Sequence, residues 1–273
     1  MTPETDSRLL LDGAIAAATT AGNHARDNRH RSRDAVQRAQ HDVKLQLDME
    51  CQQVALSTIA DRFPDHTILG EEDALLERGI QGADSGSLAW ETEGYLWIVD
   101  PIDGTVNFTH GLRQWCCSVA VWKDGAAVAG AVYAPELDEL YAATSTTAAT
   151  LNGKPLAVSA TDDTTQAMVM AGLDNVGMGN EPPLAILTRL ALQTQRPRAM
   201  GCAALDCCQV ACGRADGYFE SAIHVWDVAA AGLIVTRAGG HASILWRHDR
   251  TRLGYLTSNA RLHDRLRAII APQ

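Results

Sequence analysis

The stretch "WIVDPIDGTVNF", residues 97–108, places two carboxylates three positions apart around a proline. Asp100 ends an apolar run that predicts a buried strand, and Pro101 has no N–H to give to regular strand pairing. Asp100 and Asp103 are therefore expected to converge from a turn, with the carbonyl of Ile102 between them left without a strand partner. Such hard oxygen ligands suit Mg²⁺, which keeps several waters and completes its shell with substrate phosphate.

The residues that follow Asp103 favour an anion-binding site. Gly104 and Thr105 would present backbone N–H groups to a phosphate if a helix begins here. An Asp turn followed by an Asp helix cap also fits a single "DPxDG", so this motif alone leaves both interpretations open. Two further acids accompany it, since Glu71 follows the apolar "ILG" and Asp227 opens the apolar "DVAAAG". Taken alone, Asp227 would only complement a helix dipole.

Together, "GEE", "DPIDGTVNF" and "WDVAAAG" resemble the inositol monophosphatase family of Mg²⁺-dependent, Li⁺-sensitive phosphatases. The resemblance covers about residues 40 to 260, and the segment "GCAALDCCQVACGRADGYFESAIHVWDVAAAGLIVTRAGG" is especially close to the family's substrate lobe. It implies an α+β fold, an alternating αβαβα layered sandwich, in a homodimer. It also implies hydrolysis of a small phosphate monoester, inositol monophosphate first, by metal-activated water.

The resemblance assigns two or three Mg²⁺ ions, with Li⁺ as an inhibitor, to Glu71, Asp100, the Ile102 carbonyl, Asp103 and Asp227. It implies that Thr105 and Glu71 orient the attacking water and that Asp48 supports Thr105. Phosphate and substrate contacts are implied for Asp103, Gly104, Thr105, Gly201, Cys202, Ala203, Glu220 and Asp227. Glu220, predicted to end the strand "GYFE", would accept hydrogen bonds from vicinal hydroxyls. Its alternative role is a salt bridge across the dimer interface.

Other substrates stay open. Relatives with the same metal motifs act on histidinol phosphate, fructose 1,6-bisphosphate and 3′-phosphoadenosine compounds. A second phosphate would need basic residues, for which Arg198 and Arg214 are the candidates. The chain departs from the family in "DVKLQLD", where Lys44 and Leu45 replace Val and Thr, and this puts a third, weaker metal site in doubt. A different class of function is a catalytically competent fold that serves as a regulatory RNA-processing or transcription partner.

Composition limits the partners. The chain has 23 basic and 33 acidic side chains and a formal charge of −10, which argues against a nucleic-acid surface. Its start is unlike a signal peptide, and no run reaches about 18 uncharged apolar residues, so we expect a cytoplasmic protein without a membrane partner. The seven cysteines are odd in number and lack a paired CxxC pattern, which predicts reduced thiols in the core.

Hydrophobic periodicity predicts helices over residues 6–27 and 43–62, separated by a basic mobile loop at 26–38. The loop's arginines, Arg26, Arg29, Arg31, Arg33 and Arg38, are expected to form a flap over the phosphate entrance. Four strands of an antiparallel meander follow, and the second half alternates strands with helices at about 184–193, 203–213, 227–238 and 260–270. We expect one domain over 1–273, with the metal motifs in a lobe of about 1–150 and the substrate segment in a lobe of about 151–273.

Overall fold

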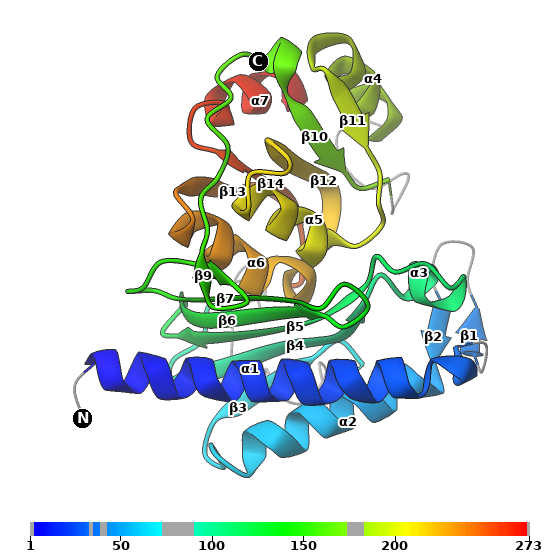
Figure 1. Cartoon of the computed structure of the whole chain (residues 1–273), viewed down its shortest axis with the longest axis vertical. Coiled ribbons are helices and arrows are strands. Elements are labelled where there is room, and N and C mark those ends of the chain that lie inside the picture. The colour runs from blue at the N-terminus through cyan, green and yellow to red at the C-terminus, as the bar shows by residue number, and fades with distance from the viewer. Residues whose placement is uncertain (1–2, 33–34, 39–42, 73–89, 174–182, 272–273) are drawn as a thin grey trace.

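A computed structural model describes residues 3–32, 35–38, 43–72, 90–173 and 183–271. Helices and sheets alternate in five layers in the order α1 and α2, a seven-stranded sheet, α5 and α6, a five-stranded sheet, and α4 and α7 (Figure 1). The predicted α+β layered sandwich is thereby confirmed. The helices are α1 Pro3–Asp27, α2 Gln46–Ala60, α3 Thr105–Thr109, α4 Pro183–Gln193, α5 Ala203–Ala211, α6 Val225–Arg237 and α7 His263–Ile270, with short 3₁₀ turns η1 Arg29–Arg31 and η3 Thr164–Gln166.

The first sheet contains the predicted meander. Its order is β3-β4-β5-β6-β7-β8-β9, and all neighbours are antiparallel except the pair β3 and β4, which the sequence did not indicate. Asp124 and Gly125 join β5 to β6 with φ of 50° and 77°, as a tight hairpin requires. The strands are β3 Thr67–Gly70, β4 Tyr95–Asp103, β5 Cys116–Lys123, β6 Ala126–Ala134, β7 Glu139–Thr144, β8 Thr150–Leu151 and β9 Lys154–Pro155.

The second sheet has the order β11-β10-β12-β14-β13, in which β10 is parallel to both β11 and β12. It lies between the layer of α5 and α6 and the layer of α4 and α7 (Figure 1). The strand β11 was not predicted from the sequence. The strands are β10 Met168–Ala171, β11 Arg196–Arg198, β12 Gly217–His224, β13 Gly240–Arg247 and β14 Arg252–Asn259.

Strand alternation divides the buried side chains among three cores. In β5, Cys116 packs toward α5 and α6, whereas the next residue, Cys117, packs toward α1 and α2. The third core lies beneath α4 and α7 and includes Val169 and Phe219. Period-two alternation thus lets both sheets bury side chains on both faces, as a five-layer fold requires.

The segment between the first two helices differs from its prediction. Ala35–Arg38 forms β1, which pairs with β2, Val43–Leu45, in a separate two-stranded sheet, so the loop prediction is wrong there. The helix expected from residue 43 begins at Gln46, because residues 43–45 take part in this pairing. Arg31 makes two hydrogen bonds of 2.7 Å to Glu50, which ties it to α2. Arg33 lies outside the described residues.

Candidate active site

The predicted turn at Asp100 is instead an irregularity within a strand. β4 continues through Pro101 to Asp103, and its pairing with β5 shifts register between Asp100 and Asp103. The prediction that Asp100 is the last strand residue is therefore wrong, although Pro101 does interrupt the pairing, since it has no N–H. Asp100 Oδ1 accepts the N–H of Ile102 at 3.1 Å. This register shift directs Asp100 and Asp103 toward the same site.

A short helix begins directly after this strand. Gly104 has φ of 87°, and a Cβ there would lie 2.9 Å from the carbonyl oxygen of Gln114, so only glycine fits. The hydroxyl of Thr105 donates a hydrogen bond of 2.9 Å to the carbonyl of Ile102. Its oxygen lone pairs are consequently directed away from that contact and can accept a hydrogen bond from another group.

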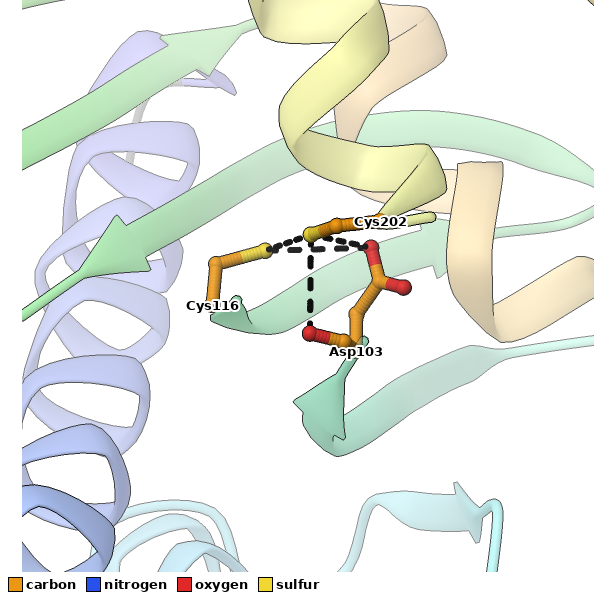
Figure 2. Close-up of side chains that lie close together, drawn as sticks. All are labelled: Asp103, Cys116 and Cys202. Carbon is orange, nitrogen blue, oxygen red and sulfur yellow. Dashed lines mark hydrogen bonds between the residues drawn. The ribbon is translucent and has the colours of Figure 1, made fainter. Parts of the chain in front are cut away.

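The carboxylate of Asp103 lies against the N-terminus of α5. Its Oδ2 accepts the N–H of Ala204 at 2.6 Å and the thiol of Cys202 at 3.2 Å, and its Oδ1 accepts the N–H of Ala203 at 3.2 Å. Figure 2 shows Cys202 and Cys116 on one side of this carboxylate. The α5 N-terminus therefore stabilises the ionised form of Asp103. The bond from Ala203 also occupies the N–H of a residue for which the resemblance implied a substrate contact.

Two other elements complete the acid cluster. Asp227 lies in the first turn of α6, where its Oδ2 accepts the N–H of His224 at 3.1 Å. It therefore caps the helix while facing the other acids. Glu71 follows β3, and its N–H donates to the carbonyl of Val99 at 3.0 Å. The parallel pairing of β3 with β4 brings Glu71 beside Asp100.

Burial raises the pKa of each acid, and neighbouring carboxylates add to this for Glu71, Asp100 and Asp227. Asp100, Asp103 and Asp227 each have a carboxylate oxygen within 4.8 Å of the others. Burial, followed by the charge of Glu71, raises the pKa of Asp100 well above its usual value, and burial with the charge of Asp103 does the same for Asp227. Burial raises the pKa of Asp103 to about 6 and that of Glu71 to about 8. A hard divalent cation would relieve this repulsion, so the oxygen donors fit Mg²⁺.

A cavity of about 310 Å³ opens over these acids. Most residues assigned from the sequence line it, namely Glu71, Asp100, Ile102, Asp103, Gly104, Thr105, Gly201, Cys202, Ala203, Glu220 and Asp227. Asp48 does not belong to the lining that the structure describes. It is buried in the first turn of α2, and its charge contributes to the raised pKa of Glu71.

Glu220 lies within β12 and not at its end, because this strand runs on to His224. A register shift between Glu220 and Ile223 bends the strand beside the cavity. The carboxylate accepts the hydroxyl of Tyr218 at 2.6 Å and is 3 % exposed. It also fills the space where a Cβ on Gly172 would stand, so a side chain at residue 172, directly after β10, would displace it.

Sequence reasoning missed several polar residues of this site, among them Asn107, Asp206 and Arg252. Asn107 donates to the carbonyls of Gln114 and Met200 at 2.8 and 2.7 Å and so joins α3 to the segment before α5. Asp206 and Arg252 line the cavity. Asn107 stands in the motif that was quoted, but Arg252 reaches the site only through the pairing of β14 with β12. No local pattern signals that pairing.

The other residues weighed from the sequence lie in ordinary structural contacts. Arg214 forms a 2.7 Å ion pair with Glu139, and neither Arg198 nor Arg214 lines the described cavity. His224 accepts Nε of Arg252 at 2.9 Å and stacks on Trp226 with ring centroids 4.3 Å apart. All seven cysteines are free thiols, six of them buried, as predicted.

Comparison with known proteins places this geometry in a family. Residues 6–262 match the inositol monophosphatase family. The chain belongs to this family. An inositol-1-monophosphatase of Synechocystis sp. is 35 % identical over 243 residues, covering 84 % of this chain and 77 % of the relative. A Nus factor SuhB of Pasteurella multocida is 35 % identical over 235 residues, covering 85 % of this chain and 83 % of the relative.

A solved structure agrees with the sequence comparison. The inositol monophosphatase of Anabaena (Nostoc) sp. superposes with a TM-score of 0.80 at 30 % identity, covering 96 % of this chain and 95 % of the other. Family membership makes the chain a phosphoric monoester hydrolase. Within the described ranges, no helix combines the length and apolarity needed to cross a bilayer.

Proposed function

We propose that the chain hydrolyses inositol monophosphate in a Mg²⁺-dependent reaction. The observation that carries this proposal is the cluster of Asp100, Asp103 and Asp227, whose oxygens lie within 4.8 Å of one another beneath the cavity. Phosphate monoesters are anionic, and an acidic cavity would repel them without a cation. The family's monoester chemistry therefore needs a divalent ion at these carboxylates.

Glu71, Asp100, the Ile102 carbonyl, Asp103 and Asp227 would hold Mg²⁺, and Li⁺ would inhibit at the same ligands. When bound, Mg²⁺ neutralises phosphate oxygens and lowers the pKa of water. The Thr105 hydroxyl donates to the Ile102 carbonyl, so its oxygen can accept a hydrogen bond from the attacking water, and Glu71 orients that water from the other side. Gly104 N–H and Thr105 N–H face the phosphate. Asp48 stays a predicted support for Thr105.

The polyol substrate is proposed from Glu220. A buried carboxylate at the cavity wall accepts hydrogen bonds from neighbouring hydroxyls, and the Tyr218 hydroxyl fixes its position. A bisphosphate or a 3′-phosphoadenosine compound would bring a second phosphate to a wall that holds Asp206 and Glu220 as well. Arg252 is the basic residue of that wall in the described lining. These charges favour an inositol monophosphate over a doubly phosphorylated ligand.

Asp100→Asn tests the metal-dependent phosphatase. The amide keeps an oxygen acceptor for the Ile102 N–H and removes one ligand charge. We expect kcat with inositol 1-phosphate to fall by more than about 100-fold, beyond the loss typical of a group that only orients a metal ligand. Isothermal titration with Mg²⁺ should show correspondingly weaker binding. The control is Asp65→Asn, which neutralises an exposed acid that does not line the described cavity. Full activity of Asp100→Asn, or of the unaltered enzyme in EDTA, contradicts the proposal.

A regulatory role in RNA processing or transcription is the second candidate, because a SuhB relative is as similar as a phosphatase relative. The carboxylate cluster favours catalysis, since a binding partner needs no such cluster. We also propose the family's homodimer and a single domain of two lobes for this chain. Inositol 1-phosphate, histidinol phosphate, fructose 1,6-bisphosphate and 3′-phosphoadenosine 5′-phosphate, compared by kcat/KM, decide the substrate.

A further inference from the structure

Two cysteines and an aspartate bring three metal-binding atoms together beside the cavity. Cys116 opens β5, Cys202 precedes α5, and Asp103 ends β4. The sulfurs of Cys116 and Cys202 are 3.6 Å apart, and they lie 3.8 and 3.2 Å respectively from Asp103 Oδ2 (Figure 2). Two neighbouring strands and a segment 86 residues after Cys116 thus converge on one small triangle of donors.

The edges of this triangle match those of a tetrahedral zinc site. With Zn–S of about 2.3 Å and Zn–O of about 2.0 Å, ligands of a tetrahedral ion lie about 3.8 Å apart for two sulfurs and about 3.5 Å for a sulfur and an oxygen. The observed separations of 3.6, 3.8 and 3.2 Å are close to these values. Small side-chain rotations would suffice to place a cation among the three atoms.

The surroundings provide both enclosure and access. Cys116 is 0 % exposed and Cys202 2 % exposed, so bulk water does not compete freely for their sulfurs. Cys202 and Asp103 line the cavity, which gives an ion a path to the triangle. The acids around that cavity attract any divalent cation. Asp103 Oδ2 accepts the Ala204 N–H and the Cys202 thiol, and the lone pair facing Cys202 becomes free for an ion once that thiol loses its proton.

We infer that Asp103, Cys116 and Cys202 form a binding site for a thiophilic divalent cation of the zinc class, distinct in its sulfur ligands from the Mg²⁺ site. Sulfur donors select Zn²⁺ over Mg²⁺, because thiolates are soft ligands and Mg²⁺ prefers oxygen. As the two sulfurs bind, two thiol protons leave to solvent. Water fills the fourth position, as at zinc sites with three protein ligands.

The site shares Asp103 with the proposed Mg²⁺ ligands. An ion held by Asp103 Oδ2 and the two sulfurs draws this carboxylate out of the Mg²⁺ ligand set, so Zn²⁺ acts as an inhibitor. Only this consequence rests on the proposed function. Binding itself depends on the three side chains and is measured without substrate.

Co²⁺ titration of the reduced protein in excess Mg²⁺ tests the binding. Tetrahedral thiolate ligation gives Co²⁺ a sulfur-to-metal charge-transfer band in the near ultraviolet, which carboxylate-bound Co²⁺ lacks. We expect this band at one equivalent of Co²⁺ and its removal by one equivalent of Zn²⁺, because Zn²⁺ binds thiolates more tightly.

Matched variants distinguish Co²⁺ binding at this site from Co²⁺ binding by other cysteines. Cys116→Ser and Cys116→Ala should abolish the band, and Cys202→Ser should do the same. Cys117→Ala should retain it, because Cys117 is an equally buried neighbour on the opposite face of β5. A band of undiminished intensity in folded Cys116→Ser, or none in the unaltered protein, overturns the proposal. Far-ultraviolet circular dichroism establishes that each variant is folded.

Inhibition is measured separately with inositol 1-phosphate. The Zn²⁺ concentration for half inhibition, relative to each variant's own activity, should rise about 10-fold or more in Cys116→Ser, a loss typical of a weakened metal site. It should not change in Cys117→Ala. If the band is lost with Cys116 or Cys202 while neither the unaltered protein nor Cys117→Ala hydrolyses inositol 1-phosphate, the zinc site stands and the proposed function fails. Equal inhibition of both variants contradicts a thiol-bound inhibitory ion.

Discussion

At the scale of single residues, Glu220 determines the hydrogen-bonding properties of one wall of the cavity. Its carboxylate is buried, is held by Tyr218, and faces the same cavity as the acid cluster. A carboxylate accepts hydrogen bonds in all of its lone-pair directions, whereas an amide replaces part of that capacity with N–H donors. The wall therefore suits hydroxyl donors of a polyol.

Glu220→Gln is expected to weaken recognition of the polyol and to spare the chemistry. With inositol 1-phosphate, kcat/KM should fall about 10-fold, equivalent to about 1.4 kcal/mol for a charge-assisted hydrogen bond. Hydrolysis of an aryl phosphate without vicinal hydroxyls should change little and keep its Mg²⁺ dependence. An equal loss on both substrates would instead indicate a role in folding or in dimer contacts.

At the scale of the elements, the end of β10 lies so close to the Glu220 carboxylate that the residue after it has no room for a side chain. Gly172 directly follows β10 and donates its N–H to the carbonyl of Phe219 at 3.0 Å, which holds the strand end beside Glu220. A methyl group at residue 172 would occupy the space of the Glu220 carboxylate. The glycine is needed for close approach and not for backbone conformation.

Gly172→Ala should therefore reproduce the effect of losing Glu220. We expect kcat/KM for inositol 1-phosphate to fall about 10-fold, because the displaced carboxylate no longer accepts the substrate hydroxyls. In a Glu220→Ala background the same substitution should have almost no further effect, since the clashing group is gone. Additive losses in this double-mutant cycle would show that residue 172 acts independently of Glu220.

Local signals predicted most of these elements, and the misses share one cause. The apolar runs of β4 to β7 and the turn residues Asp124 and Gly125 predicted the meander, because both signals are local in sequence. The continuation of β4 to Asp103 and of β12 to His224 depends on pairing with β5 and β14, which lie outside each strand's own segment. Contacts of that kind leave no mark in a single window of residues.

The same distinction applies to the site. Asp100, Asp103 and Asp227 are recognisable because their motifs are short and contiguous, and the structure brings all three together. Cys116 was expected only to pack, since its nearness to Cys202 depends on the placement of α5 over β5. Arg252 likewise enters through β14.

At the scale of the whole molecule, the acid cluster opposes folding unless a cation accompanies it. Glu71 follows β3, whereas the aspartates lie in β4 and α6, so the completed fold brings together charges that the unfolded chain keeps apart. Burial raises the pKa of Asp103 from 3.8 to about 6 and that of Glu71 from 4.5 to about 8. The folded state therefore binds protons more tightly than the unfolded state.

The sign of the pH dependence follows from these directions. Below about pH 4 both acids are protonated in either state, and their stabilising contribution is fully present. As the pH rises through about 6 and then about 8, the contribution is lost, because the unfolded chain ionises first and the folded chain resists ionisation. Mg²⁺ binds the ionised cluster in the folded state alone and so offsets this loss.

We therefore expect the Mg²⁺-induced rise in Tm, measured against EDTA by calorimetry, to be larger at about pH 8 than at about pH 5. Glu71→Gln should reduce the difference between the two pH values, since it removes the acid with the higher pKa of the two. Asp65→Asn, at an exposed residue, should leave the difference unchanged. A rise in Tm that is equal at both pH values, or a variant Glu71→Gln that responds as the unaltered protein does, would show that cation binding is not coupled to these carboxylates.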